Sequence, residues 1–473
     1  MNSSAQDIKN FKGLTQDSRQ VKPGYLFAAL PGSNADGSAY INDAVRSGAS
    51  AVLAPKNTDL PAGVELITDD NPRRRFALMA AAFYEGQPDY VAAVTGTNGK
   101  TSVVHFAQQL WEAIGVKAAS IGTLGLHGGG MDRSGSHTTP DPVSLHEELA
   151  ELSKAGVTHL AMEASSHGLD QYRLDGVKVK VAGFTNLSRD HLDYHESMEE
   201  YLAAKTRLFT EILGSDGIAV LNADSDEYDS LRNAKASRIL SYGHKGEDLK
   251  VIYLSATATG QKMRLEIIGE GYDLEFPLVG EFQLMNALCA LGLVIAEDPE
   301  NSERTKKLVK ALEDLKSAPG RLQLVDGHPS GAAIYVDYAH TPDALEHVLK
   351  ALRPHTKKNL ACLFGCGGDR DKGKRPLMGN VAEDLADRVI VTDDNPRWEN
   401  PAQIRQEILE TAPLAKEIAG RAEAIHEAIT GLNEGDVLVI AGKGHEQGQI
   451  FGDEVEDFDD VKVAVQVIEE LKS

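Results

Sequence analysis

Short apolar runs alternate with longer helical patterns through the last third of the chain. In the segments between these short runs, apolar residues recur every three or four positions, as in helices. Two of the segments begin with typical helix starts, Thr341 before Pro342 and Asn400 before Pro401. The runs are rich in β-branched side chains, as expected for strands buried on both faces. We expect these strands at residues 332–336, 360–364, 389–391 and 437–440. The alternation predicts a parallel sheet covered by helices, a Rossmann-like α/β domain.

Charged or glycine-rich segments follow all four of these strands. Ligands of open α/β sheets bind beyond the carboxyl ends of the strands. The segments are Asp337 and residues 365–370, 393–397 and 442–446. We therefore expect an active-site rim at this edge of the sheet.

Two breaks in the pattern divide the rest of the chain. Residues 85–88 (EGQP) separate a helical run from the new buried strand at 90–94, and residues 317–320 (SAPG) follow an amphipathic helix. The predicted domains are therefore residues 1–88, 89–317 and 318–473. With a central parallel or mixed sheet, the fold class is α/β in three domains.

Composition narrows the class of protein. The 473 residues carry a formal charge of −23 from 48 Lys and Arg and 71 Asp and Glu, which argues against general binding to nucleic acid or anionic membranes. No apolar run approaches the ~18 residues of a membrane span, and the start, MNSSAQDIKN, does not resemble a signal peptide. Three cysteines are too few for a disulfide framework. We expect a cytoplasmic protein and, by default, a monomer.

The central domain opens with a phosphate-binding pattern. The strand at 90–94 runs into TGTNGKTS, in which two glycines allow a tight turn, Lys100 supplies a charge for phosphates and Thr101 offers a hydroxyl to Mg²⁺. The spacing differs from the general P-loop, because Val94 stands five positions before Gly99. The predicted ATP-binding residues of this loop are Gly96, Thr97, Asn98, Gly99, Lys100, Thr101 and Ser102.

A lysine interrupts the apolar stripe of a later helix. Ser197 and Glu200 form a capping-box pattern, and the stripe that follows leaves Lys205 where spacing calls for a core residue. Such a lysine must extend to solvent, pair with an acid or lose its charge.

Acidic and imidazole groups stand near the same loop in the predicted sheet. Glu163 follows the buried strand at 158–162, where a carboxylate suits Mg²⁺. His191 and His195 are four residues apart, a spacing that also suits zinc, although a third protein ligand is not evident.

Seven ordered motifs resemble those of the Mur ligases, which build the bacterial cell-wall peptide. They are TGTNGKTS at 95–102, DSR at 17–19, TTPD at 138–141, EASSH at 163–167, NLSRDHLD at 186–193, DYAHTPDAL at 337–345 and GKGHE at 442–446. One motif departs from the family pattern, since Gln283 stands where asparagine is expected.

The resemblance implies an ATP- and Mg²⁺-dependent ligase of peptidoglycan precursor synthesis. It implies catalytic roles for Lys100, Glu163, His191 and Lys205, with Lys205 modified to N6-carboxylysine. It further implies Mg²⁺ ligation by Thr101, Glu163, His191 and the carbamate of Lys205. A desolvated lysine favours the neutral amine that reacts with CO₂, which gives this modification a physical route.

The same resemblance assigns the substrates, UDP-N-acetylmuramoyl-L-alanyl-D-glutamate and meso-2,6-diaminopimelate. Beyond the loop, it places ATP near Asn286, Arg321, Asp337 and His340. It places the sugar peptide at Ser18, Ser33, Asn34, Ala35, Asn98, Thr138, Thr139, Ser165, Gln171 and Arg173. It places diaminopimelate at Arg370, Asp394, Asn395, Pro396, Arg397, Gly442 and Glu446.

The choice of amino acid rests on the DNPR segment at 394–397. Arg397 can bind the far carboxylate of diaminopimelate in a fork, and Glu446 can accept from the far ammonium. Lysine lacks that carboxylate and would leave Arg397 unpaired. An identical tetrapeptide at residues 70–73 follows no strand of the C-terminal sheet, so we interpret it as a turn before a helix.

Three alternatives stay open at this point. One is a ligase that adds L-lysine, and another is a ligase like folylpolyglutamate synthetase, which has a similar nucleotide loop. The third is a nucleotide-binding regulator without catalysis. The DSR and DNPR segments count against the folate ligase, and the set of Lys100, Glu163, His191 and Lys205 counts against the regulator.

Overall fold

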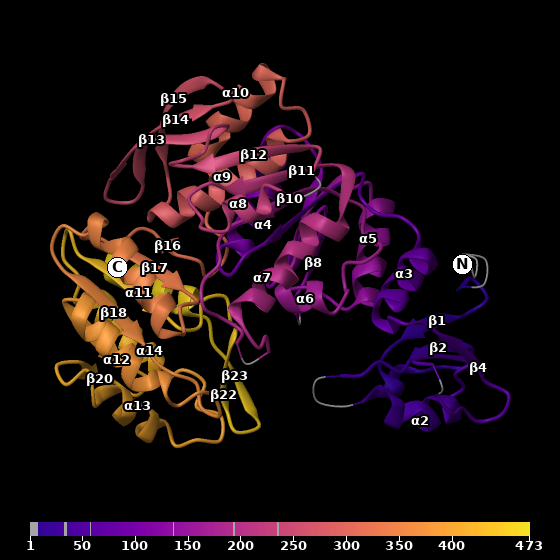
Figure 1. Cartoon of the computed structure of the whole chain (residues 1–473). Coiled ribbons are helices and arrows are strands. Elements are labelled where there is room, and N and C mark those ends of the chain that lie inside the picture. The colour runs from indigo at the N-terminus through magenta and orange to yellow at the C-terminus, as the bar shows by residue number, and fades with distance from the viewer. Residues whose placement is uncertain (1–7, 33–35, 57, 136, 193, 234–235) are drawn as a thin grey trace. The chain divides into compact units, whose positions relative to one another are not determined.

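The structure, a computed structural model, describes residues 8–32, 36–56, 58–135, 137–192, 194–233 and 236–473 (Figure 1). The chain forms two compact units, Met1–Glu247 with Cys289–Asn301, and Asp248–Leu288 with Ser302–Ser473. Within the described residues, no helix is long and apolar enough to cross a membrane. The predicted domain boundaries at residues 88 and 317 stay predictions.

The first unit begins with a four-stranded parallel sheet. Its spatial order is β1 (Gly13–Thr15), β2 (Tyr25–Ala28), β3 (Ala51–Ala54) and β4 (Glu65–Thr68). Apolar side chains fill both faces, with Leu26 and Phe76 in one cluster and Phe27 and Ile41 in the other. The helices here are α2 (Ile41–Arg46) and α3 (Pro72–Tyr84), with short 3₁₀ turns at Ser18–Gln20 and Gly37–Tyr40.

A mixed sheet in the same unit places the predicted phosphate loop at its centre. Strand β5 pairs in parallel with β9 on one side and β10 on the other, so the loop emerges between the ends of two neighbours. The order of strands is β12 (Arg238–Gly243), β11 (Leu213–Asn222), β10 (Val179–Phe184), β5 (Tyr90–Thr95), β9 (His159–Glu163), β6 (Ala118–Gly122), β7 (Gly125–Gly128) and β8 (Met131–Arg133). The expected strands at 90–94 and 158–162 are thereby confirmed to within a residue.

Helices around this sheet begin where the sequence predicts. Ser197 caps α7 by accepting the N–H of Glu200 at 3.2 Å. The apolar pattern continues past Arg207 into a π-helical turn, Leu208–Ile212. The helices are α4 (Lys100–Ala113), α5 (Pro142–Lys154), α6 (Ser166–Asp170), α7 (Met198–Arg207) and α8 (Tyr228–Leu231), and α9 (Glu281–Ile295) belongs to both units.

The second unit contains an antiparallel meander and the predicted Rossmann-like sheet. The meander is β13 (Leu249–Ala256), β14 (Gln261–Ile267) and β15 (Glu270–Phe276). The larger sheet has the order β16 (Gln323–Val325), β17 (Ala333–Asp337), β21 (Val437–Ala441), β18 (Leu360–Phe364), β19 (Arg388–Val391) and β20 (Lys416–Glu417), parallel except for β16. All four predicted C-terminal strands are confirmed.

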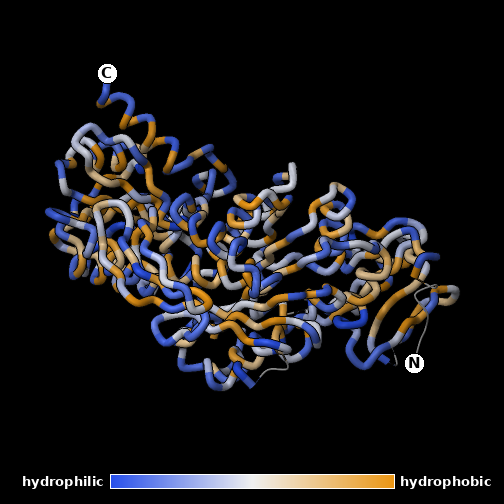
Figure 2. The backbone as a smooth tube through the Cα atoms, turned by 90° about the horizontal axis from the view of Figure 1, so that it is seen from above, coloured by the Kyte–Doolittle hydropathy of each residue, from blue (hydrophilic) through white to orange (hydrophobic). Residues whose placement is uncertain are grey.

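Helices cover both faces of the larger sheet, because separate apolar clusters lie on each face. These helices are α11 (Pro342–Leu352), α12 (Lys374–Leu385), α13 (Pro401–Leu409), α14 (Arg421–Thr430) and α15 (Asp460–Lys472), with a 3₁₀ turn at Arg353–His355 and a hairpin of β22 (Gly448–Phe451) and β23 (Glu454–Asp457). Helix α10 (Ser302–Ala311) and the 3₁₀ turn Leu312–Asp314 lie beside the meander instead, where Glu313 accepts the N–H of Glu275 (Figure 1). Thr341 and Asn400 cap α11 and α13 as predicted. Figure 2 shows the amphipathic pattern of α15, whose hydrophilic and hydrophobic positions alternate around the helix.

Candidate active site

The phosphate loop leaves β5 in a conformation that only glycine tolerates. Gly96 has a φ of 149°, and a Cβ there would lie 1.9 Å from Oγ1 of Thr185. Gly99 has a left-handed φ of 89° and precedes Lys100, the first residue of α4. The first amides of α4 therefore lie at a helix N-terminus directly after the sheet, an arrangement that attracts anions.

The adjacent segment at residues 185–188 holds the loop in place. Asn186 accepts the N–H of Thr97 on its carbonyl at 2.8 Å and the N–H of Asn98 on its side chain at 2.9 Å. Thr185 donates to the carbonyl of Asn98 at 2.6 Å. The amides of Thr97 and Asn98 are therefore engaged within the protein.

Two lysines converge on one carbonyl of this loop. Nζ of Lys100 donates to the carbonyls of Gly96 at 2.9 Å and Thr97 at 2.8 Å, and Nζ of Lys205 donates to Gly96 at 2.8 Å. Lys205 is 1% exposed and lies over the ring of Tyr201, 4.1 Å from its centroid. Burial, aided by the charge of Lys100, holds the pKa of Lys205 well below its usual value. Its predicted core position is confirmed.

Glu163 ends β9 with a carboxylate that faces the turn after β6. It is 1% exposed and accepts from the N–H of Thr123 at 2.8 Å and from its hydroxyl at 3.3 Å. A Cβ at Gly122 would lie 2.1 Å from Oε1 of Glu163, so the carboxylate occupies space that a larger residue would fill. Neither Thr123 nor Gly122 was singled out from the sequence.

His191 lies in a cluster of aromatic rings. Its ring centroid is 5.0 Å from that of His167 and 6.2 Å from that of Tyr201, and its backbone has a φ of 53°. His195 is buried, and its Nε2 has no hydrogen-bond partner among the described residues. In the described part of the chain, no three His, Cys, Asp or Glu side chains form a metal-binding group.

Five of the six residues predicted for the peptide end of the sugar substrate, all but Asn98, are linked by hydrogen bonds through Thr123 and Glu163. Thr139 donates to the carbonyl of Glu163 at 2.9 Å and contacts the hydroxyl of Ser165 at 3.0 Å, while Thr138 contacts Thr123 at 3.0 Å. Arg173 donates to the carbonyl of Thr139 at 2.8 Å and to Oε1 of Gln171 at 2.8 Å. These contacts bring Thr138, Thr139, Ser165, Gln171 and Arg173 close together, and their role in binding the sugar peptide stays a prediction.

Arg173 is a partly buried cation held by neutral acceptors. Within the described residues it makes no ion pair, and burial lowers its pKa. A carboxylate or phosphate would complete its coordination. Ser18 opens the 3₁₀ turn that Asp17 caps. The predicted Ser33, Asn34 and Ala35 lie outside the described residues.

In the second unit, the predicted nucleotide residues meet around Arg321. Asn286 donates to Oε1 of Gln283 at 3.2 Å, and Nε2 of Gln283 donates to the carbonyl of Arg321 at 3.1 Å. Gln283, the departure from the family pattern, is therefore a buried link between two predicted residues. The sequence analysis noted Gln283 only as a departure from the family pattern and did not predict its contacts with Asn286 and Arg321.

Asp337 and His340 complete this group. The carboxylate of Asp337 accepts the N–H groups of Leu322 at 2.7 Å and Ala339 at 2.8 Å, which fixes the turn after β17. Nδ1 of His340 contacts the carbonyl of Tyr338 at 2.9 Å. The guanidinium of Arg321 lies 4.8 Å from the centroid of the Tyr338 ring.

Arg397 presents its guanidinium over the glycine-rich loop that follows β18. Its Nη1 donates to the carbonyl of Gly368 at 2.8 Å, and a Cβ at Gly367 would lie 2.8 Å from the same atom. The φ of Arg397 is 53°, which costs a non-glycine residue ~1–2 kcal/mol. Hydrogen bonds to Ile450 and Gly452 hold this backbone in place. Neither Arg397 nor the exposed Arg370 makes an ion pair among the described residues.

The rest of the predicted amino-acid site is linked through Asn395. Its Nδ2 donates to Oε2 of Glu446 at 2.9 Å, and its Oδ1 accepts from Lys443 at 3.0 Å. Asp394 accepts the N–H of Asn395 at 2.7 Å and lies 2.8 Å from a Cβ built on Gly442. The sequence analysis missed Lys443, although a lysine directly after a continuous apolar strand was a usable signal.

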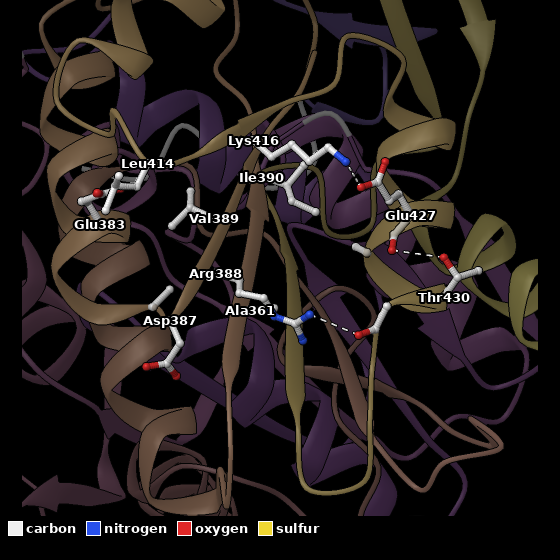
Figure 3. A pocket seen from close by; sticks show the side chains of 13 residues that line it. Ala361, Glu383, Asp387, Arg388, Val389, Ile390, Leu414, Lys416, Glu427 and Thr430 are labelled. Carbon is white, nitrogen blue, oxygen red and sulfur yellow. Dashed lines mark hydrogen bonds and ion pairs between the residues drawn. The ribbon is translucent and has the colours of Figure 1, made fainter.

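A pocket of about 470 Å³ lies away from this rim, beside the first residues of β19 (Figure 3). Four of its charged side chains are paired, since Arg388 pairs with Asp436 at 3.0 Å, Lys416 pairs with Glu427 and Asp387 pairs with Arg353 at 2.6 Å. These contacts join neighbouring elements at the amino end of the strands. The pocket therefore does not include the predicted site residues.

Three family models match successive parts of the chain. They are "Mur ligase family, catalytic domain" at residues 10–92, "Mur ligase middle domain" at 94–294 and "Mur ligase, glutamate ligase domain" at 320–444.

Curated relatives match over nearly the full length. A UDP-N-acetylmuramoyl-L-alanyl-D-glutamate–2,6-diaminopimelate ligase of Caulobacter vibrioides is 51% identical over 97% of this chain and 95% of the relative. The ligase of the same name from Mesorhizobium japonicum is 51% identical over 95% and 93%. A solved structure with that name is 34% identical, covers 100% of both chains and has a TM-score of 0.73. The chain belongs to the Mur ligase family.

Proposed function

We propose that this chain is an ATP-dependent ligase that joins meso-2,6-diaminopimelate to UDP-N-acetylmuramoyl-L-alanyl-D-glutamate in the cytoplasm. The observation that carries the proposal is the convergence of Lys100 and Lys205 on the carbonyl of Gly96 at the end of β5. A phosphate loop with Lys100 for the phosphates and a second, buried lysine that can become a metal-binding carbamate suits the transfer of a phosphoryl group to a carboxylate. The names of the relatives supply the two substrates.

The reaction requires that the D-glutamate side-chain carboxylate be activated. A carboxylate oxygen attacks the γ-phosphorus of ATP, the bond to the β,γ-bridging oxygen breaks, and an acyl phosphate and ADP result. The amine of diaminopimelate then attacks the acyl carbon, forms the amide, loses a proton and displaces phosphate. The chain contributes position and charge: Lys100 and the start of α4 hold phosphates, while Arg173 holds an anionic group of the peptide substrate.

The residues near the loop suit Mg²⁺ once Lys205 carries a carbamate. Thr101 and Glu163 offer oxygen, the donor that Mg²⁺ prefers, but the described residues contain no group of three His, Cys, Asp or Glu side chains that would provide a further anionic ligand. A carbamate on Lys205 would supply it, and His191 would complete the predicted set. Bound there, Mg²⁺ would neutralise phosphate charge during transfer.

The protein environment of Lys205 favours this modification. Burial and the neighbouring Lys100 both favour the neutral amine, which is the form that attacks CO₂. The N–C bond forms as the amine loses a proton, and the product is an anion where a cation would repel Mg²⁺.

Phosphate release tests the ligase. The protein receives Mg²⁺-ATP and UDP-N-acetylmuramoyl-L-alanyl-D-glutamate, with meso-diaminopimelate, L-lysine or no amino acid in parallel. We expect release that depends on diaminopimelate. Phosphate release with lysine but not with diaminopimelate would support a ligase and contradict diaminopimelate as its amino acid. No release with either amino acid would contradict the ligase.

The carbamate needs a separate test. Protein equilibrated with ¹³C-bicarbonate should show a carbamate carbon by NMR, and the signal should be missing from K205R, which keeps the charge. Replacement of Lys180, an exposed lysine paired with Asp216, should leave the signal intact. A signal that persists in K205R would contradict the assignment.

A further inference from the structure

Lys443 is a buried cation at the amino-acid rim whose three donors are all used inside the protein. It is 0% exposed, and its Nζ donates to the carbonyl of Gly448 at 2.6 Å, to Oδ1 of Asn395 at 3.0 Å and to Oε2 of Glu446 at 3.3 Å. An ammonium has three N–H groups, so these contacts saturate it. Lys443 therefore has no donor left for a substrate.

These contacts fix the orientation of the Asn395 side chain. Because Lys443 and the N–H of Ile450, at 3.1 Å, both donate to Oδ1, that atom must be the oxygen of the amide. The amide nitrogen is thereby turned toward Glu446, to which it donates at 2.9 Å.

The two oxygens of the Glu446 carboxylate differ in their partners. Oε2 receives both Lys443 and Asn395, whereas Oε1 has no hydrogen-bond partner among the residues that the structure describes. The side chain of Glu446 is 36% exposed, so this second oxygen can reach a ligand. A carboxylate held on one oxygen and open on the other is suited to accept from an ammonium.

We propose that Lys443 is the positioning residue for amino-acid selection, which holds Asn395 and Glu446 in the arrangement that accepts the far ammonium of the incoming diamino acid. The inference rests on the proposed function for the identity of that acid. Lys443 acts only through its neighbours. Its removal would free Glu446 to turn, would take one of two donors from Oδ1 of Asn395 and would take a donor from the carbonyl of Gly448.

Substitution of Lys443 by methionine keeps the length of the side chain and removes the charge. We expect K443M to raise the KM for meso-diaminopimelate about 10- to 100-fold, as loss of a buried hydrogen-bonded charge does. The KM values for ATP and for the sugar peptide should change less than about threefold, because the side chain of Lys443 donates only to Asn395, Glu446 and Gly448. A merely structural role would not separate the substrates in this way.

The matched control is R388M, at the opposite edge of the same sheet. Arg388, which is labelled in Figure 3, pairs at 3.0 Å with the buried Asp436, which is not among the side chains drawn there, so the loss of Arg388 also leaves a buried acid short of a partner. We expect R388M to lower the melting temperature and to leave the KM for diaminopimelate unchanged. An equal rise of this KM in R388M and K443M would overturn the proposal.

A double variant tests whether Lys443 works through Glu446. If it does, the combined loss in K443M/E446Q should be smaller than the product of the two single losses. If K443M does not fold, K443R carries the test: it keeps the charge but replaces the compact ammonium by a planar fork, and its KM for diaminopimelate should rise at least threefold. A folded K443R or K443M with the KM of the natural protein would overturn the proposal.

A crystal structure of K443M, or of K443R, separates this inference from the proposed function. We expect the side chains of Asn395 and Glu446 to leave their present contact, whether or not the protein ligates diaminopimelate. If they stay in place, Lys443 does not position them. If they move while the natural protein releases no phosphate with diaminopimelate, the positioning role stands and the proposed function fails.

Discussion

The tetrapeptide Asp-Asn-Pro-Arg occurs twice in this chain and adopts two different structures. At residues 70–73, Asn71 caps α3 by accepting the N–H of Arg74 at 3.0 Å, and Pro72 is the first helical residue. At residues 394–397, the side chain of Asn395 instead binds Lys443 and Glu446. Here the arginine has a φ of 53° and presents its guanidinium at a strand end.

The residues that follow each copy explain the difference. After the first, RRFALMAAAFY continues as an amphipathic helix that buries Phe76 in the core of the N-terminal sheet. After the second, Asn400 and Pro401 start a new helix, α13. Because a residue before proline disfavours the helical conformation, a helix starting at Pro396 would end within one turn.

The comparison teaches that a tetrapeptide motif specifies chemistry only together with its neighbours. Both copies contain a good helix-capping asparagine followed by proline. Only the second copy follows a strand of the Rossmann-like sheet. There, the buried Lys443 donates a hydrogen bond to the side-chain oxygen of Asn395. The amino-acid site is thus built by tertiary contacts that override the local preference for a helix start.

The largest difference between the copies should appear when their arginines are removed. We expect R397A to lower kcat/KM for diaminopimelate about 100- to 1,000-fold, since a carboxylate loses a two-pronged partner in a partly buried site. R73A should leave the KM for diaminopimelate unchanged. Steady-state phosphate release checks both, and a similar rise of this KM in the two variants would mean that the second copy has no special role.

The two asparagines should give a smaller and qualitatively different contrast. We expect N395A to raise the KM for diaminopimelate about tenfold, because Lys443 and Glu446 each lose a partner. The KM for ATP, measured in the same assay, should stay within about twofold. An unchanged KM for diaminopimelate would remove Asn395 from the site.

N71A should affect stability instead of catalysis. Loss of the cap should lower the free energy of unfolding by ~1 kcal/mol in the transition that reports the N-terminal sheet. Urea denaturation followed by fluorescence measures this change, and the KM for diaminopimelate serves as the control. Unchanged stability would show that Asn71 does not cap α3 in solution.

The smallest expected effect concerns the backbone at the two arginines. R73G places glycine inside a helix and should cost ~1 kcal/mol. R397G replaces a residue at positive φ, so relief of strain should offset the flexibility of glycine and keep the change below ~0.5 kcal/mol. Thermal melting of both variants provides the measurement. A larger loss for R397G than for R73G would contradict the reading of Arg397 as strained.

Much of the fold could be predicted from the sequence because its signals are local. Residues 360–364 are apolar at every position and form β18 without a shift. The capping residues Ser197, Thr341 and Asn400 each begin a helix. The apolar stripe placed Lys205 at a core position, and its burial is one of the outcomes that this position allowed.

Other features depend on contacts that local patterns do not contain. The left-handed backbone of Arg397 is fixed by hydrogen bonds to Ile450 and Gly452, more than fifty residues further along the chain. The role of Gln283 follows from its contact with Arg321. By contrast, β14 alternates buried and exposed residues from Gln261 to Ile267, a local signal that the sequence analysis did not use.

The most direct test of the account is the ratio of kcat/KM for meso-diaminopimelate to that for L-lysine, measured in the natural protein and in R397Q. If the second tetrapeptide selects the amino acid, the natural protein should favour diaminopimelate strongly. R397Q should then lose activity with diaminopimelate but not with lysine, so that the ratio falls by at least tenfold. An equal loss with both amino acids, or an unchanged ratio, would contradict the claim that Arg397 recognises the far carboxylate.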